Sequence, residues 1–290
     1  MTDTATPAPY PAAAWRLLLA PQPLAGTSNM ATDEAILRAV AEGAAPPTLR
    51  FYGWTPPCLS LGYAQPAADV DAERLSRLGY DWVRRPTGGR AILHTDELTY
   101  SVIVPMDEPR VRGGVVESYQ QLSAGLLRGL GRLGLSVRAD KEYDGALTGL
   151  PKGPVCFEVP SNYEITVGDG AGGRPRKLLG SAQVRKLGVV LQHGTLPLTG
   201  DIGRICDVLC FTGEAERGQA RQRVAARATT VAQVIGREVS WQAAAEALAQ
   251  GFAEALNLEL QPAALSPHEA ELAEQLRVEK YATAAWNRRV

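Results

Sequence analysis

The sequence has few cysteines, lysines and histidines. Of its 290 residues four are cysteine, five are lysine and three are histidine. The cysteines are Cys58, Cys156, Cys206 and Cys210. They form no CxxC pair, so neither a zinc site nor a disulfide framework is indicated. The histidines are His94, His193 and His268. Their wide spacing lacks the pattern of metal ligands, so we expect no metal site.

The chain also lacks an excess of charge of either sign. Its formal net charge is −1, and its isoelectric point is near 6.3. This balance argues against a nucleic-acid-binding protein, which usually has a basic stripe. No apolar run reaches the roughly 18 residues of a membrane span. The first 20 residues lack the basic start and long apolar core of a signal peptide. We expect a disordered leader over residues 1–13 of a cytoplasmic protein, by default a monomer.

What is present is ordinary for a globular protein, with 45% hydrophobic and 21% charged residues. Strand-like segments joined by turns alternate irregularly with amphipathic helices. The absence of a regular βαβ order predicts an α+β fold, with a mainly antiparallel or mixed sheet packed against helices. We expect a main domain over residues 14–228 and a helical C-terminal extension over residues 229–290. The extension should pack on the main domain, because its end, "KYATAAWN", is too apolar to hang free.

One helix is well marked, over "SNMATDEAILRAVAEG" at residues 28–43. Ser28 or Asn29 is a suitable N-terminal cap. Asp33 and Glu34 would then fall in the first turns, where the helix dipole favours acidic groups.

Each cysteine can be a small buried hydrophobe or a nucleophile. Cys206 and Cys210 are one helical turn apart in an apolar stretch, and Cys58 opens an apolar strand, so we expect all three in the core. Cys156, in "PKGPVCFEVPSNYE", leaves both interpretations open. A nearby ammonium would stabilise its thiolate. Lys177 is a candidate, because it lies across the loose turn "GDGAGGRPR".

Three further segments suit a binding site. In "RRPTGGRAILH", residues 84–94, the two glycines allow a ligand to approach the backbone, and Arg84, Arg85 and Arg90 can face anions. The alternative is a plain turn with solvated arginines. In "LGSAQVRK", three small residues in a strand, Gly180, Ser181 and Ala182, suggest close passage of a ligand. In "LQHGTLPL", His193 precedes a glycine, although a core histidine is the simpler interpretation.

Several ordered blocks together resemble a known family. They are "NMATDEAIL", "LRFYGWTPPCLSLGYAQ", "VRRPTGGRAILHTDELTYSV", "PSNYEITV", "KLLGSAQVRK", "LQHGTLPL" and "KYATAAWN". From about residue 14 to the end, the chain resembles the lipoate/octanoate transfer branch of the biotin/lipoate protein ligase superfamily. The resemblance implies a biotin/lipoate ligase-like catalytic fold, with residues 14–228 as the catalytic acyltransferase domain.

Within that superfamily, the chain looks like the cysteine-dependent octanoyltransferases. ATP-dependent lipoate–protein ligases usually have a third glycine where this sequence has Arg90, and they need no cysteine. The resemblance implies transfer of an octanoyl group from acyl carrier protein to a lysine of a lipoyl-domain protein, such as the glycine cleavage H protein or an E2 subunit. It implies no cofactor and no ATP. The alternatives are an ATP-dependent ligase, with Cys156 a bystander, and a non-catalytic protein that binds lipoyl domains or acyl groups.

The resemblance also implies roles for individual residues. Cys156 would carry the acyl thioester, and Lys177 would lower the thiol pKa and polarise the acyl carbonyl. The approach of the acyl group and pantetheine would be lined by Arg85, Gly88, Gly89, Arg90 and His94. The floor of an acyl tunnel would be formed by Gly180, Ser181 and Ala182, with His193 and Gly194 nearby. The cluster of Arg84, Arg85 and Arg90 would offer a basic surface to the acidic partner proteins.

Overall fold

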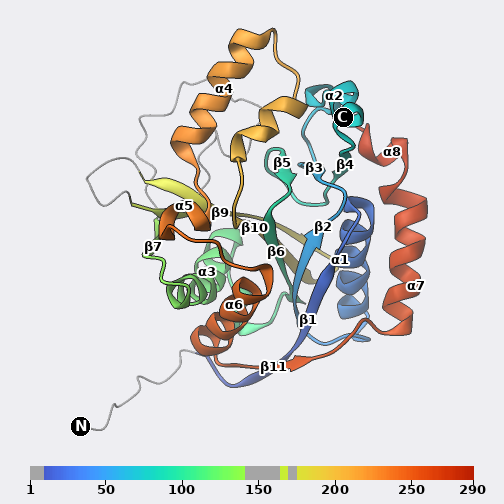
Figure 1. Cartoon of the computed structure of the whole chain (residues 1–290). Helices are drawn as coiled ribbons and strands as arrows, with labels where there is room; N and C mark the ends of the chain where they lie inside the picture. Colours follow the sequence, from blue (N-terminus) through green and yellow to red (C-terminus); the bar gives the residue numbers. More distant parts are fainter. Residues whose placement is uncertain (1–9, 141–163, 169–174) are drawn as a thin grey trace.

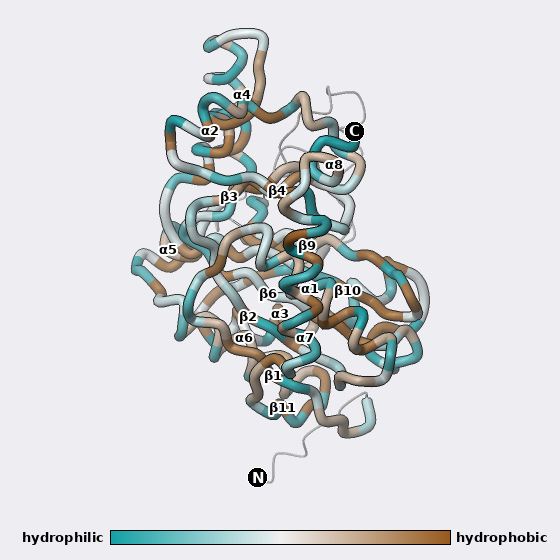
Figure 2. The backbone as a smooth tube through the Cα atoms, turned by 90° about the vertical axis from the view of Figure 1, so that its right-hand side faces the viewer, coloured by the Kyte–Doolittle hydropathy of each residue, from teal (hydrophilic) through white to brown (hydrophobic). Residues whose placement is uncertain are grey.

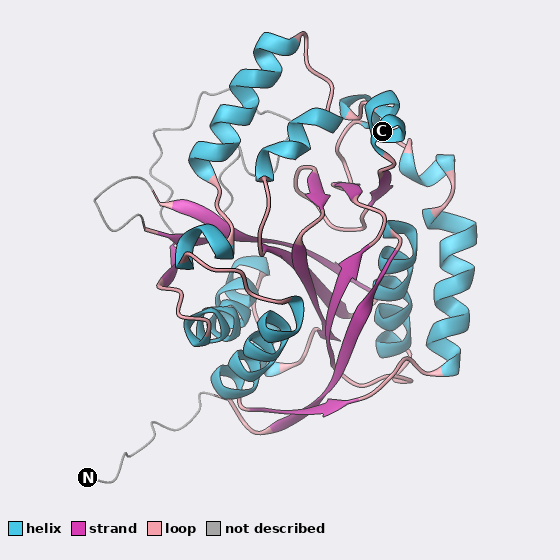
Figure 3. Ribbon diagram, in the orientation of Figure 1, coloured by secondary structure: helices cyan, strands magenta, loops and turns pink. Residues whose placement is uncertain are grey.

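Two sheets and the helices around them make up the fold (Figures 1 and 3). The computed structural model of the chain describes residues 10–140, 164–168 and 175–290. The large sheet has the order β11 (Leu258–Pro262), β1 (Ala13–Leu24), β2 (Thr48–Trp54), β6 (Glu97–Pro105), β10 (Val189–Pro197), β9 (Arg176–Lys186), β8 (Glu164–Val167) and β7 (Val137–Asp140). Strand β1 is parallel to both of its neighbours, and the other pairs are antiparallel.

Helices cover both faces of the large sheet. The α-helices are α1 (Gly26–Ala41), α2 (Ala72–Leu78), α3 (Val115–Arg132), α4 (Glu214–Arg227), α5 (Val231–Ile235), α6 (Trp241–Leu256), α7 (Pro267–Leu276) and α8 (Ala284–Asn287). Helices α3 and α6 pack together on one face, and α1 and α7 lie on the other (Figure 1). Figure 2 looks onto the second face, where α7 runs beside α1. Within the described ranges, no helix has the length and apolar run that crossing a membrane requires. The predicted α+β fold with mixed sheets is confirmed.

Strand β6 shows how the sheet divides the core. Its alternate residues Tyr100, Val102 and Val104 belong to the cluster that contains Phe252 of α6. Ile103 points to the other face and packs with α1. Successive side chains of a strand point to opposite faces. A central strand covered on both sides is therefore largely apolar, which explains the run "LTYSVIVP". Its polar residues Thr99 and Ser101 are buried as well.

The smaller sheet has the order β4 (Asp81–Arg84), β3 (Cys58–Leu61) and β5 (Ile92–His94). Its core packs against the 3₁₀ segment Ile202–Val208 and against α4. The strands on either side of the Pro-Pro turn, β2 and β3, therefore belong to different sheets. The chain passes from the large sheet to the small sheet at this turn. A space between the two sheets can hold a ligand.

Helix α1 starts earlier than its sequence predicts. It begins at Gly26, with Ala25 as its cap, so neither Ser28 nor Asn29 caps it. The Asn29 amide instead donates hydrogen bonds to the carbonyls of Leu24 and Gly53, at 3.2 and 2.9 Å. Asp33 and Glu34 lie beyond the first turn and are buried. Contacts with other parts of the fold, and not the helix dipole, therefore stabilise the carboxylates of Asp33 and Glu34.

The cysteine predictions hold for two of three residues. Cys58 and Cys206 are buried, as expected, but Cys210 is exposed. The 3₁₀ segment that contains Cys206 ends at Val208. The four-residue spacing therefore does not bring both cysteines to one face. Cys156 lies outside the described residues.

The sequence suggested a helical extension over residues 229–290, but the structure also has a strand there. The extension supplies β11, which pairs in parallel with β1 at the edge of the large sheet. Helix α6 packs on α3, and α7 packs on α1. Tyr281 of "KYATAAWN" is fully buried, and the indole N–H of Trp286 donates to the carbonyl of Arg84 at 2.8 Å. The division of domains at residue 228 stays a prediction.

Candidate active site

A cavity of about 300 Å³ lies between the two sheets. Strands β3 and β5 of the small sheet contribute to its wall, and β2, β6, β9 and β10 contribute from the large sheet. All ten residues predicted to bind substrate line it: Arg85, Gly88, Gly89, Arg90, His94, Gly180, Ser181, Ala182, His193 and Gly194. Residues far apart in the sequence thus meet around one space of the size that small-molecule ligands occupy.

The glycine turn at residues 87–90 is fastened by Arg85. One guanidinium nitrogen of this buried side chain donates to the Ser60 carbonyl at 3.0 Å. The other donates to the carbonyls of Gly88 and Arg90, both at 2.8 Å. Gly89 has a φ of +95°, a backbone conformation that residues with a Cβ rarely adopt. The turn that edges the cavity is therefore fixed by its sequence and by Arg85.

Arg84 and Arg85 do not form the basic surface that the sequence suggested. Arg84 is fully buried, and its guanidinium donates to the carbonyls of Gly62, Gln65 and Asn287 at 2.8, 2.6 and 2.9 Å. Burial lowers the pKa of Arg84, with a smaller effect of Arg289 in the same direction. Both side chains satisfy backbone carbonyls inside the protein, and only Arg90 of the three is partly exposed.

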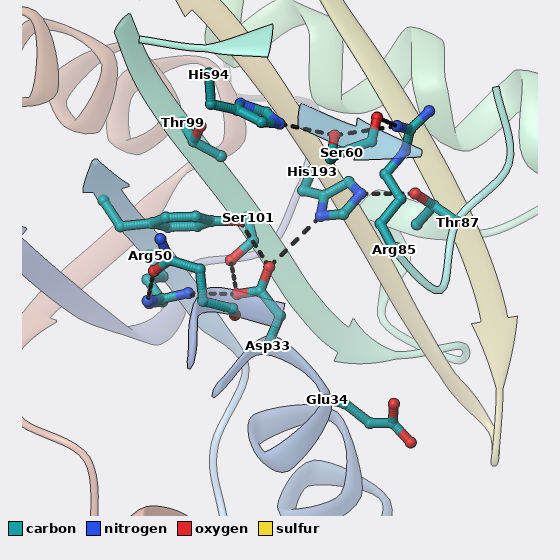
Figure 4. A network of polar contacts seen from close by, with 12 residues as sticks. Asp33, Glu34, Arg50, Ser60, Arg85, Thr87, His94, Thr99, Ser101 and His193 are labelled. Carbon is teal, nitrogen blue, oxygen red and sulfur yellow. Dashed lines mark hydrogen bonds and ion pairs between the residues drawn. The ribbon is translucent and has the colours of Figure 1, made fainter. Parts of the chain in front are cut away.

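His193 joins the glycine turn to helix α1 (Figure 4). Its Nε2 lies 2.7 Å from the Thr87 hydroxyl, and its Nδ1 lies 3.5 Å from an Asp33 carboxylate oxygen. Burial lowers the pKa of His193, partly opposed by Asp33. The imidazole is therefore neutral near pH 7. It connects the two elements and adds no charge to the cavity.

Asp33 is held mainly by cationic and hydroxyl partners. Arg50 donates to its Oδ1 at 2.7 Å, and hydroxyls of Tyr52 and Ser101 donate at 2.8 and 3.0 Å. Burial alone would raise the pKa of Asp33, but Arg50 and His193 outweigh burial and lower it. The carboxylate is therefore ionised, and it joins Arg50, Ser101 and His193 in one polar network (Figure 4).

His94 stands in a second polar chain on the opposite wall. Its Nδ1 lies 2.7 Å from Glu97, and its Nε2 lies 2.8 Å from the Ser60 hydroxyl. Its ring stacks on Trp54, with centroids 3.9 Å apart and planes at 11°. The Glu97 carboxylate therefore fixes the orientation of the ring, and both His94 and Ser60 line the cavity.

The floor is built by two paired strands. Ser181 of β9 is opposite Gly194 of β10, and the Ser181 hydroxyl lies 2.7 Å from the Tyr100 hydroxyl. A Cβ added to Gly194 would come within 2.5 Å of the Ser181 Oγ and 2.7 Å of the Gly180 carbonyl oxygen. Only glycine leaves this point of the floor open.

Lys177 lies beside that floor. It is buried, and its Nζ is 2.6 Å from a Glu164 carboxylate oxygen on the neighbouring strand β8. A Cβ on Gly180 would meet the Lys177 Nζ at 2.9 Å, so the ammonium is in contact with a residue that lines the cavity. The predicted nucleophile, Cys156, lies outside the described residues.

Sequence reasoning missed the acidic partners Asp33, Glu97 and Glu164. The available signal is a carboxylate inside an otherwise apolar segment, as in "NYEITV" or "DELTYSV". Buried acidic residues need a paired cation or hydrogen-bond donors. The partners come from elsewhere in the chain, so the sequence alone could not name them.

The fold and the cavity define a protein of the lipoate–protein ligase type. A bi-partite lipoate protein ligase from an archaeal lipoylation system of Thermoplasma acidophilum superposes with a TM-score of 0.78 at 26% identity, covering 95% of this chain and 96% of the other. A lipoate-protein ligase A bound with ATP gives 0.74 at 26% identity, covering 96% and 99%.

The lipoyl protein ligase A/B catalytic domain model matches residues 26–253, and the chain belongs to this family. Octanoyltransferase LipM of Kyrpidia tusciae is 46% identical over 279 residues, covering 95% of this chain and 98% of that protein. Octanoyltransferase LipM of Bacillus subtilis is 38% identical over 265 residues, covering 89% and 92%. These relatives confirm two predictions. The protein is an acyltransferase enzyme, and it is an octanoyltransferase related to the lipoate–protein ligases.

Proposed function

We propose that the protein takes an octanoyl group from octanoyl-acyl carrier protein onto Cys156 and passes it to a lysine of a lipoyl-domain protein. The observation that carries this proposal is the cavity lined by all ten predicted binding residues, with the Lys177 ammonium in contact with its floor. The names of the relatives, octanoyltransferases, support the same acyl group.

The cavity suits an acyl chain. Its wall includes Met30, Tyr52, Trp54 and Ile92, which are large apolar or aromatic side chains. Burial of each CH₂ group contributes about 0.8 kcal/mol. An eight-carbon chain therefore gains enough free energy from such a wall to be distinguished from much shorter ones.

The reaction proceeds in two acyl transfers that need no oxidant and no ATP. The Cys156 thiolate attacks the thioester carbonyl of the donor, a C–S bond forms, and the pantetheine thiolate leaves and takes up a proton. The acceptor lysine amine then attacks the Cys156 thioester, a C–N bond forms with loss of an amine proton, and Cys156 leaves as a thiolate. The first exchange is nearly balanced, and amide formation drives the second.

Lys177 would act at the first step. An ammonium near a thiol stabilises the thiolate, and it also polarises a carbonyl oxygen that develops negative charge. The described cysteines are less suited to the nucleophilic role. Burial raises the pKa of Cys58 far above its usual value, with smaller contributions from Asp81 and Glu97. Burial also raises the pKa of Cys210.

The acceptor is the part of the proposal that rests on a neighbour. The similar archaeal ligase belongs to a lipoylation system together with its E2 lipoyl domain. For this chain we propose a lysine of a lipoyl domain, in an E2 subunit or in a glycine cleavage H protein. A second similar structure, of a lipoate-protein ligase A, is bound with ATP, and an ATP-dependent ligase is therefore the second candidate.

One experiment separates these functions. The protein is incubated with octanoyl-acyl carrier protein, and its intact mass is measured before and after a lipoyl domain is added. We expect an octanoyl adduct that is absent in Cys156→Ser and unchanged in the control Cys210→Ser. Lipoylation that requires ATP and free lipoate, and that survives Cys156→Ser, would favour the ligase. No transfer under either condition would favour a binding protein without activity.

A further inference from the structure

A second pocket, of about 650 Å³, lies next to the acyl cavity. The two share the glycine turn, because Gly88, Gly89 and Arg90 line both. Strand β9 also connects them. Its residues 180–183 line the acyl cavity, and residues 184–186 line the second pocket. A ligand that lay along β9 would therefore pass from one space into the other under the glycine turn.

The second pocket is positively charged. Its lining contains four cationic side chains, Arg90, Arg185, Lys186 and Lys280, and no carboxylate among the lining residues that the structure describes. The charge of Lys280 is offset by Glu34, with which it pairs. The Arg185 guanidinium donates hydrogen bonds to neutral acceptors, including the carbonyls of Gly113 and Gly114 at 2.6 and 2.9 Å. These acceptors carry no charge, so they do not offset that of Arg185.

Lys186 is the most accessible of these cations. Its side chain is 52% exposed, and its Nζ lies 3.8 Å from the Glu34 carboxylate, which also binds Lys280, Tyr281 and Arg38. A carboxylate shared among so many donors neutralises Lys186 only in part. Lys186 is thus available to an anion that enters from solvent.

Aromatic rings form the other side of the pocket. Tyr63 and Trp286 line it, with ring centroids 5.9 Å apart in an edge-on arrangement. The exposed Arg289 guanidinium lies 4.2 Å from the Tyr63 ring centroid and 4.9 Å from that of Trp286. This side therefore combines flat apolar surface with one more cation.

We infer that the second pocket binds the phosphodiester of the donor's phosphopantetheine arm, with Lys186 and Arg90 facing the phosphate. The inference rests on the proposed function. From Lys186 to Gly180 the chain takes six strand steps, which span about 20 Å at about 3.3 Å per residue. That distance suits a long flexible arm with an anion at its outer end. The thioester at its inner end would then reach the floor beside Lys177.

Charge complementarity favours the carrier-protein donor over other small acyl donors. The exposed cations Lys186 and Arg289 would also attract a carrier protein whose surface is acidic around its arm. Such contacts between exposed charges weaken as salt is added. ATP shares the phosphate chemistry, and binding of ATP at this pocket is the competing outcome.

The test measures binding separately from transfer. Cys156→Ser protein is titrated with octanoyl-acyl carrier protein carrying a fluorescent label, with and without the further change Lys186→Glu. The matched control is Arg237→Glu, a charge reversal at an exposed position outside both pockets. We expect Lys186→Glu to weaken binding at least about tenfold, and Arg237→Glu to have little effect. Octanoyl-phosphopantetheine should compete with the labelled protein, and octanoyl-pantetheine, which lacks the phosphate, should compete much less.

The outcomes are distinct from those of the transfer experiment. Equal binding by the Lys186→Glu and Arg237→Glu proteins would overturn the inference, as would equal competition by the two pantetheine compounds. Displacement of the labelled carrier protein by ATP, weakened in Lys186→Glu, would assign the pocket to a nucleotide instead. Binding that depends on Lys186 without any acyl transfer would refute the proposed function and leave the pocket assigned.

Discussion

The Lys177 ammonium nitrogen lies 2.6 Å from a carboxylate oxygen of Glu164, and both side chains are buried. The two residues belong to neighbouring strands, β9 and β8, in the part of the sheet next to the acyl cavity. We propose that the Lys177 ammonium assists acyl transfer. The Glu164 carboxylate, from the neighbouring strand, holds this ammonium in place.

Loss of this carboxylate should destabilise the fold. Removing one partner of a buried ion pair takes the nearest counter-ion from the remaining charge, which costs about 3–5 kcal/mol. We expect Glu164→Gln to lower the free energy of unfolding in urea by up to that amount and to slow formation of the octanoyl adduct. Glu259→Gln, at an exposed strand position, is the control. A Glu164→Gln protein as stable and as active as this control would contradict the assignment.

Glu34 should make stability depend on acid pH. Burial would raise its pKa, but hydrogen bonds from Lys280 and Tyr281 outweigh burial and lower the pKa from 4.5 to about 2. Because the folded-state pKa is below the unfolded value, this stabilisation is complete above pH 4.5 and is lost as the pH falls towards 2. Its size is at most about 3 kcal/mol, since burial also lowers the pKa of Lys280 and offsets part of the gain.

The measurement is urea unfolding between pH 6 and pH 3. We expect the stability of Glu34→Gln to fall less over this range than that of the unmodified protein, whereas Glu246→Gln, exposed on α6, should follow the unmodified protein. Identical pH profiles for Glu34→Gln and Glu246→Gln would show that Glu34 does not carry this dependence.

The floor of the cavity should not tolerate a methyl group at Gly194. A Cβ there would lie 2.6 Å from a Tyr100 ring carbon and 2.5 Å from the Ser181 Oγ, so the floor must move or the cavity must narrow. We expect Gly194→Ala to lower kcat/KM for octanoyl transfer by about tenfold, mostly through KM. Gly131→Ala on α3, where a Cβ meets nothing within 4 Å, should keep activity and slightly raise stability. Equal activity of the two variants would mean that no ligand uses this floor.

The C-terminal segment should contribute to stability through Asn287. Its side-chain oxygen accepts from the Arg84 N–H at 2.8 Å, and its amide donates to the Tyr281 carbonyl at 2.8 Å. We expect Asn287→Ala to lower the free energy of unfolding by about 1–3 kcal/mol, because buried polar groups lose their partners. Arg288→Ala, at the exposed neighbouring position, should change it little. The urea midpoints of the two variants test this, and coincident midpoints would refute it.

Local patterns were enough to find most of the elements around the site. The small residues in "LGSAQVRK" predicted a strand with room for a ligand, and the structure has β9 there. The resemblance of ordered blocks then named ten residues that the structure brings to one cavity. A strand of small residues can be predicted because strand alternation and glycine backbone freedom are properties of neighbouring residues. That the ten residues bind substrate stays a prediction.

Other predictions depended on partners that the sequence does not name. The arginines of "RRPTGG" looked like a surface for acidic proteins, but Arg84 and Arg85 are buried and bind backbone carbonyls. The cationic surface that the structure offers instead includes Lys186 and Lys280, from strand β9 and the C-terminal segment. An arginine side chain can hydrogen-bond to water or to buried carbonyls. The residue type does not show which, and only the packing of the folded chain decides between them.

The sequence by itself determined the α+β fold class, the cavity-lining glycines and the family. Each of these follows from short-range periodicity or from ordered motifs. The tertiary structure alone decided which acidic residues fix Lys177, His193 and His94, where β11 joins the sheet, and which cations border the acyl cavity. Those facts are contacts between residues distant in the chain, and their free energies depend on burial and distance, which exist only once the chain has folded.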